Sequence, residues 1–148
     1  MKTAFDVAQY FLALVDEESG DLISNLKLQK LLYYAQGLHL ALYDRPLFGD
    51  KIIAWNHGPV VVDLYHEYSK YGSGAIPVPE NFDASAFTEE ESEVIEEINR
   101  AFGQFSAWKL RNMTHEESPW KETPQNQEIT LSKIAAYFKT QLIRDAEE

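Results

Sequence analysis

The apolar residues of this chain recur mostly at intervals of three and four, the spacing that predicts amphipathic α-helices. A first helix is expected over residues 4–18, started by a capping box of Thr3 and Asp6 and ended by Gly20. Ser24 is the expected N-cap of a second, longer helix. Its broad apolar stripe indicates the central helix of the core. The stripe consists of Leu28, Leu31, Leu32, Ala35, Leu38, His39 and Leu42.

The second half of the chain adds a short β-prone run and more helices. Residues 51–55, Lys-Ile-Ile-Ala-Trp, predict one small β element. Pro59 suits the first position of a third helix, where its missing N–H is not needed. Later helices are expected after the N-caps Thr88 and Ser106 and from about Thr130. The pattern therefore predicts a mainly α fold, a compact bundle of about six helices with one small β element.

Length and composition narrow the class of protein. The 148 residues contain no repeat and no long polar linker, so a single domain over residues 1–148 is expected. No apolar run has the length of a signal peptide or a membrane span, which favours a cytoplasmic protein. Cysteine is absent, which excludes disulfides and thiolate zinc sites.

The charge is strongly acidic. Thirteen basic and 24 acidic residues give a formal net charge of −11, which repels phosphate backbones and argues against direct nucleic-acid binding. Such a surface favours a basic protein partner. The same carboxylates also suit a surface that only maintains solubility, and both interpretations stay open.

The histidines do not assemble into a recognisable catalytic motif. His66 and His115 each precede a glutamate, as in zinc-protease helices, but Lys70 and Pro119 occupy the positions that need a second histidine. No serine elbow or phosphate-binding loop is present. We therefore expect no enzyme activity, no metal and no cofactor. A mixed site of His57, His115 and a distant carboxylate stays open.

Aromatic residues are abundant, with three Trp, eight Tyr and eight Phe. Trp and Tyr combine a large apolar body with a polar group, and both are enriched at protein interfaces. Filling of the core is the alternative interpretation for most of them.

Three segments, taken in order and spacing, carry a family resemblance. They are Asn-Leu-Lys-Leu-Gln-Lys-Leu-Leu-Tyr-Tyr-Ala-Gln at 25–36, Trp-Asn-His-Gly-Pro-Val-Val at 55–61, and 110–120 with Thr-His-Glu-Glu-Ser-Pro-Trp at its end. Together they resemble the Panacea domain, a SocA-like antitoxin family of phage-associated proteins. The resemblance covers nearly the whole chain. It implies a mostly helical domain of bacterial and prophage antitoxins that neutralises a toxin by direct protein contact.

The resemblance makes a cognate toxin the expected partner, and the acidic charge predicts that this toxin is basic. A homo-oligomer stays open. His57 is expected to fix a strand-to-helix corner, with Trp55 behind it and with His115 and Trp120 closing the same region. The polar side of the second helix is expected to lie off the apolar stripe, where it would contact the toxin or form an ordinary solvated face. The expected partner-binding residues are Lys27, Lys30, Tyr34, Gln36, Trp55, His57, Tyr65, His115 and Trp120.

Three other functions stay open at this point. One is a proteolytic adaptor that delivers a bound toxin, with the acidic segment 144–148 as the candidate tag. Another is a prophage regulator that binds a host protein. The third is a hydrolase centred on His57 and His115.

Overall fold

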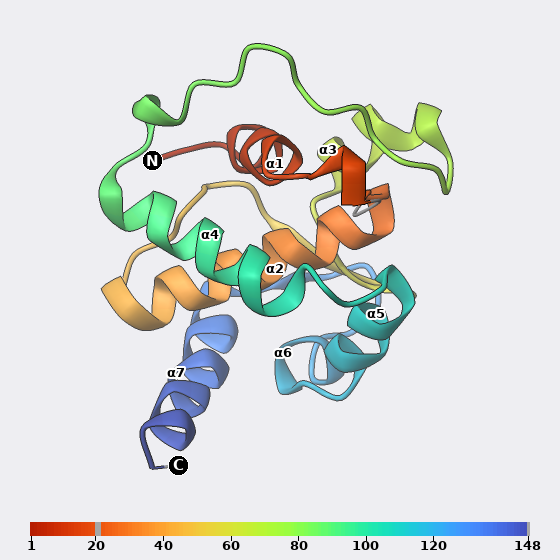
Figure 1. The fold of residues 1–148 in the computed structure, drawn as a ribbon. Helices are drawn as coiled ribbons and strands as arrows, with labels where there is room; N and C mark the ends of the chain where they lie inside the picture. Colours follow the sequence, from red (N-terminus) through yellow and green to blue (C-terminus); the bar gives the residue numbers. More distant parts are fainter. Residues whose placement is uncertain (20–21, 148) are drawn as a thin grey trace.

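The computed structural model describes residues 1–19 and 22–147, and over these residues the fold is mainly α, as predicted (Figure 1). The described part has seven α-helices, where about six were expected, and a three-stranded sheet. The helices are α1 (Ala4–Ala13), α2 (Asn25–Tyr43), α3 (Val62–Tyr68), α4 (Glu89–Phe102), α5 (Ala107–His115), α6 (Ser118–Lys121) and α7 (Leu131–Glu147). The strands are β1 (Ile52–Trp55), β2 (Gly58–Val60) and β3 (Glu128–Ile129).

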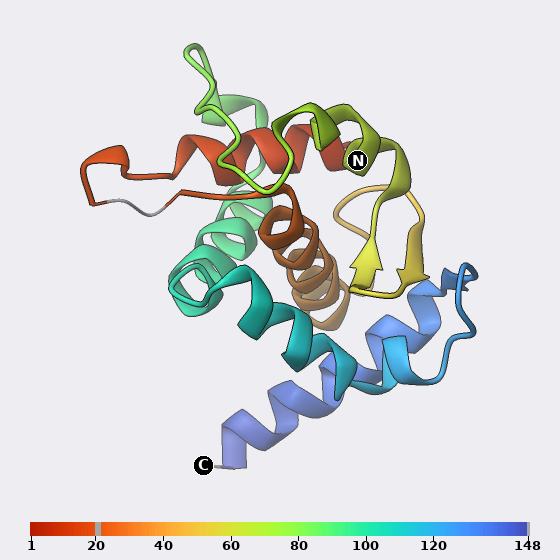
Figure 2. The same cartoon turned by 90° about the vertical axis from the view of Figure 1, so that its right-hand side faces the viewer.

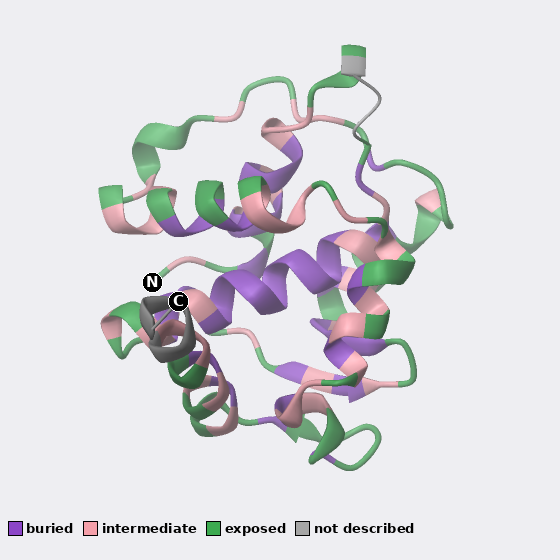
Figure 3. Ribbon diagram, turned by 60° about the horizontal axis from the view of Figure 1, so that its bottom comes forward, coloured by how far each residue is buried: buried purple, intermediate pink, exposed green. Residues whose placement is uncertain are grey.

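Helix α2 runs through the middle of the molecule, and α1, α4, α5 and α7 pack around it (Figures 1 and 2). It is buried along most of its length, as Figure 3 shows. Leu28, Leu31 and Leu32 are fully buried at the centre of the core, where each stabilises the fold by roughly 1.5–3 kcal/mol. Leu42, which the sequence placed in the same apolar stripe, is instead 47% exposed. The prediction of a central helix is confirmed.

Side-chain caps start four of the helices where the sequence predicted them. Each cap accepts a hydrogen bond from a backbone N–H in the first turn, which would otherwise lack a partner. The caps are Thr3, Ser24, Thr88 and Ser106, and Thr3 and Thr88 form full capping boxes with Asp6 and Glu91.

The first helix is shorter than predicted. It ends at Ala13 instead of residue 18, and a 3-10 turn follows at Glu17–Ser19. The carboxylate of Asp16 accepts a hydrogen bond from the N–H of Glu18, a local turn that competes with helical bonding. Gly20, the predicted helix end, lies outside the described residues.

The predicted β element is present as β1, the central strand of a sheet in the order β2-β1-β3. Both neighbours are antiparallel to it, and Ile53 pairs with Val60 in β2 and with Glu128 in β3. The sequence did not identify either neighbouring strand.

Pro59 corrects the predicted start of the third helix, because it lies in β2 while α3 begins at Val62. The N–H and C=O of Ala54, its cross-strand partner, bond to Gln127 and Asn126 beside β3. Ala54 therefore needs no donor from Pro59, whose nitrogen faces the outer edge of the sheet. An edge strand tolerates proline in this position.

The connection between α3 and α4 arches over α1 (Figures 1 and 2). Ile76 fixes its first half, since its side chain is buried and its N–H donates to the carbonyl of Ile23 at 2.9 Å.

The proposed tag segment, 144–148, falls outside the residues whose side chains the structure describes. No described helix combines the length and apolar character that crossing a membrane requires.

Candidate functional site

The turn between β1 and β2 positions Trp55 and His57, and Gly58 makes it possible. Gly58 has a φ of 109°, a conformation that other residues rarely adopt. A Cβ atom at this position would also lie 2.8 Å from Cε of Lys30 and from Oγ1 of Thr114. The sequence predicted a strand-to-helix corner here. The structure shows a β-hairpin turn, with the helix beginning after β2.

Polar side chains of α2 bind the outer edge of β2. Nζ of Lys30 donates to the carbonyl oxygen of Pro59 at 2.8 Å, and Oε1 of Gln29 accepts from the N–H of Val61 at 2.8 Å. These side chains supply the hydrogen bonds that another strand would make. They anchor the hairpin to the central helix.

Lys30 is an unusual anchor because only 1% of its surface is exposed. Burial lowers the pKa of its amine to about 7, and the nearby positive charge of Arg111 contributes to that lowering. The amine thus changes charge near neutral pH, directly behind the hairpin.

Trp120 and His115 meet the hairpin from the C-terminal half of the chain, as predicted. Nε1 of Trp120 donates to the carbonyl oxygen of Trp55 at 2.8 Å. The imidazole of His115 stacks on the Trp120 ring, with 3.9 Å between centroids and 5° between planes. Burial lowers the pKa of His115, as do the charges of Arg111 and Lys30. A neutral imidazole suits this stacked, desolvated position.

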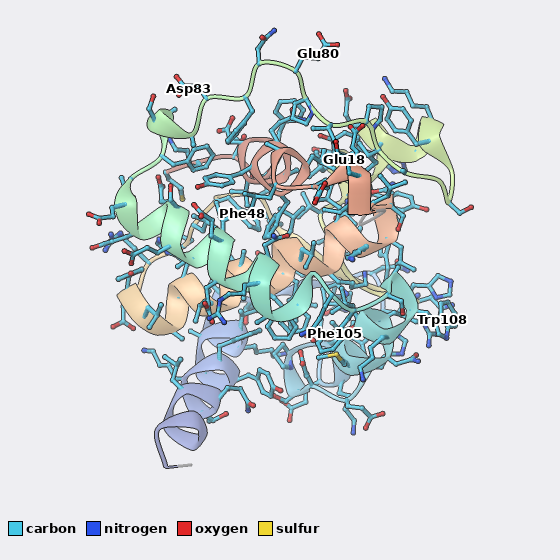
Figure 4. All side chains as sticks on the ribbon, in the orientation of Figure 1. Glu18, Phe48, Glu80, Asp83, Phe105 and Trp108 are labelled. Carbon is cyan, nitrogen blue, oxygen red and sulfur yellow. The ribbon has the colours of Figure 1, made fainter. Side chains whose placement is uncertain are left out.

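His57 lies on the surface in a cluster with Trp108 and Arg111, which we call the surface triad. Nε of Arg111 donates to Nδ1 of His57 at 3.2 Å, and its guanidinium lies 4.4 Å from the Trp108 ring centroid. The Trp108 ring is 5.7 Å from that of His57 and 54% exposed, and it projects outward from α5 (Figure 4). The predicted set omitted Trp108 and Arg111, although the helical spacing of α5 places them on one side.

A groove of about 540 Å³ opens beside the triad, and we call it the hairpin groove. Its walls come from the start of α2, the hairpin turn and α3, with Trp55 and Tyr65 packed edge to face at 5.3 Å. The lining contains no aspartate or glutamate among the described residues, although the chain has 24 of them. Four predicted partner-binding residues line it: Lys30, Trp55, His57 and Tyr65.

The prediction of an exposed polar side on the second helix is wrong for three of its four residues. Lys30, Tyr34 and Gln36 are buried, and Lys27 is half-buried with Nζ donating to the carbonyl of Gly103 at 2.5 Å. Gln36 bonds to the backbone of the 47–48 loop. Long polar side chains that satisfy backbone groups allow the whole helix to be buried, a role that hydrophobic spacing does not reveal.

Tyr34 belongs to a buried cluster that the sequence did not predict. Its hydroxyl and that of Tyr33 donate to the two carboxylate oxygens of Glu117 at 2.8 and 2.9 Å. Burial raises the pKa of Glu117 to about 7, although the tyrosine hydrogen bonds act in the opposite direction. The cluster joins α2 to the segment between α5 and α6.

The histidines of the site have few features of a metal-binding or catalytic centre. Among the described residues, no group of three His, Asp or Glu side chains is arranged to hold a metal ion. Nδ1 of His57 already accepts from Arg111, and Nε2 of His115 is buried without a hydrogen-bond partner in the described part of the chain. The arrangement positions aromatic and cationic groups at a surface, which suits binding.

Comparison with known proteins gives a family match. The model of the family described as "Antitoxin SocA-like, Panacea domain" matches residues 28–121, which include the hairpin, the surface triad and Trp120. Antitoxin SocA from Caulobacter vibrioides (strain NA1000 / CB15N) is 48% identical over 50 residues. That alignment covers 34% of this chain and only 27% of the relative's length. No solved structure gives a significant match.

Proposed function

Because this chain belongs to the SocA-like antitoxin family of the Panacea domain, we propose that it is an antitoxin that neutralises a toxin by binding it directly. The family match over residues 28–121 is the observation that carries the proposal. On this proposal the antitoxin neutralises the toxin by occupying it, and no catalytic step is needed. The geometry supports it, since the exposed groups of the site are aromatic rings and a guanidinium.

The toxin-contact surface that we propose consists of the hairpin groove and the surface triad. Trp and Arg are the residues most enriched where truncation costs an interface most of its affinity. Trp108 and Arg111 are already stacked, so binding them requires little ordering of side chains. Trp55, His57 and Tyr65 complete the contact surface from the hairpin and α3.

The remaining predicted residues act behind this surface. Lys30, His115 and Trp120 hold the hairpin in place, while Tyr34 and Gln36 anchor α2 to its neighbours. Lys27 bonds to Gly103, away from the groove. On this proposal, substitutions of these residues weaken toxin binding by disturbing the shape of the site.

We propose further that the toxin is basic, since the chain carries a net charge of −11. Complementary charge accelerates encounter and makes it sensitive to salt. A toxin acting on RNA, for example, needs a basic surface that an acidic antitoxin covers on binding.

Co-expression of the chain with each neighbouring reading frame tests the proposal. One neighbour is expected to arrest growth when expressed alone, and the chain is expected to restore growth and to co-purify with it. The proposal would be contradicted if the chain failed to restore growth against every neighbouring product that is toxic. A Trp108→Ala variant that still folds serves as the binding-deficient control.

A further inference from the structure

A second groove lies on the opposite side of α2 from the hairpin, along α4. It consists of two adjoining depressions of about 800 and 440 Å³ that share Leu38 and Glu97. The first lies between α4 and the C-terminal half of α2, and the second continues between α4 and α7. Figure 1 shows the three helices that border it. We call it the α4 groove.

The floor of the α4 groove is apolar and partly open to solvent. Half-buried Leu38 lies where the two depressions meet, with Leu42, 47% exposed, in the first depression and half-buried Leu142 in the second. Phe102 and Met113 extend the apolar lining toward α5. Exposed leucines that adjoin half-buried ones mark a surface suited to receiving another apolar face.

One rim of the groove is a row of glutamates on α4. Glu89, Glu93 and Glu97 follow at intervals of four, which places them in a stripe along one side of the helix. Glu89 and Glu93 form no hydrogen bond or ion pair with any described residue, and Glu97 pairs only with exposed Arg100 within that part of the chain. These carboxylates are therefore available to a partner.

The apolar floor and the glutamate row together indicate the chemistry of a partner that would fit the α4 groove. The glutamate row extends over eight residue steps of α4, from Glu89 to Glu97, which is roughly 12 Å at 1.5 Å per residue. A helix that lays an apolar face in a groove contacts it at intervals of three and four, and flanking lysines or arginines would meet the row. A second copy of this acidic chain would bring like charges together, so charge complementarity favours a cationic partner.

We propose that the α4 groove binds a cationic amphipathic helix of the toxin. The inference rests on the proposed function for the identity of the partner, but the groove's preference for such a helix is testable without a toxin. The leucine floor binds the apolar face of the helix, and the glutamate row binds its basic flank. The toxin thus contacts two separated surfaces of the antitoxin, on either side of α2.

A synthetic peptide is the probe for the first experiment. It has about 14 residues, with leucines at every third or fourth position and lysines elsewhere, and carries a fluorophore for anisotropy. A scrambled peptide of the same composition and a peptide with glutamates in place of the lysines serve as controls. The leucine-lysine peptide is expected to bind most tightly, and more weakly as salt rises from about 50 to about 300 mM.

Matched variants locate the binding on the protein. Leu42→Ala and Glu93→Lys are each expected to weaken peptide binding about fivefold to tenfold. Leu131→Ala, at a leucine 41% exposed on α7, and Glu67→Lys, at an exposed glutamate on α3, lie outside the groove and are expected to leave binding unchanged. None of the four side chains is buried, so thermal unfolding is expected to confirm intact folds.

Equal binding of the scrambled peptide, or equal losses in the control variants, would overturn the inference. So would sedimentation data in which Leu42→Ala abolishes self-association of the chain, because a second copy would then occupy the groove. Growth rescue separates this inference from the proposed function. Groove variants that lose the peptide but still bind and neutralise the toxin at full strength would overturn the toxin-helix inference and leave the proposed function standing.

Discussion

The buried amine of Lys30 donates a hydrogen bond to the carbonyl oxygen of Pro59, 2.8 Å away, and so joins the central helix to the outer strand of the hairpin. Gln29, its neighbour, bonds in the same way to the N–H of Val61. Two adjacent polar residues of α2 thus fix the edge that presents His57 and lines the hairpin groove. The shape of the site thus depends on hydrogen bonds made by two side chains that are almost fully buried.

The stability contributed by Lys30 is expected to depend on pH. Burial lowers its pKa from 10.5 to about 7, so between these values the unfolded chain keeps a proton that the folded chain has released. The free energy of unfolding then rises with pH. Lys30→Met removes this dependence. The free energy of unfolding of the variant, relative to that of wild type, should therefore fall as pH rises through this window, by at most about 1.4 kcal/mol per pH unit.

Urea unfolding of both proteins at several pH values measures the difference. Exposed Lys121→Met is the matched control. A parallel trend in that variant would trace the effect to net charge and contradict its assignment to Lys30.

Glu117 is expected to show the opposite trend. Its pKa is raised from 4.5 to about 7 by burial, so between these values the folded chain holds a proton that the unfolded chain has lost. The free energy of unfolding therefore falls as pH rises through the window. Glu117→Gln should gain stability relative to wild type over that range, by at most about 1.4 kcal/mol per pH unit. Urea titrations with Glu116→Gln, at the exposed neighbouring position, control for surface charge.

Gly58→Ala is expected to destabilise the fold by about 1–3 kcal/mol through conformational strain, with a further loss from the close contacts to Lys30 and Thr114. Gly72→Ala provides the control, since Gly72 also has a positive φ but a Cβ added there would have no atom within 4 Å. It should lose about 1–3 kcal/mol through conformational strain alone, without the further loss from close contacts. Chemical unfolding compares the two variants, and equal losses would show that the contacts behind the hairpin contribute nothing.

Trp108→Ala is expected to leave stability within about 0.5 kcal/mol of wild type, because the side chain is largely exposed. It should nevertheless weaken toxin binding by about 2 kcal/mol or more. Phe5→Ala, at an aromatic residue 48% exposed on α1, is the matched control and should bind normally. Calorimetric titration against the toxin found by co-expression measures both, and an unchanged affinity for Trp108→Ala would remove the surface triad from the interface.

Local signals predicted the starts of the four helices that have side-chain caps, and tertiary contacts decided what the sequence missed. The caps at Thr88 and Ser106 could be predicted because a cap acts within one turn. The strand Gly58–Val60 could not, because glycine and proline have low strand propensity and its outer edge depends on distant Gln29 and Lys30.

The same distinction applies to the site. The meeting of His115 and Trp120 with the hairpin could be predicted because both side chains can hydrogen-bond and stack, and they do so here. The burial of Tyr34 and Gln36 could not, because their partners, Glu117 and the backbone at residues 47–48, are fixed only by the complete fold.

Titration of the purified toxin with this chain, with toxin activity and complex formation recorded in the same samples, tests the central claim most directly. Neutralisation by binding predicts that lost activity follows the bound fraction of toxin, reaches completion when all toxin is bound, and returns when the complex is dissociated. Inactivation of many toxin molecules by one chain, or loss of activity without a complex, would contradict it.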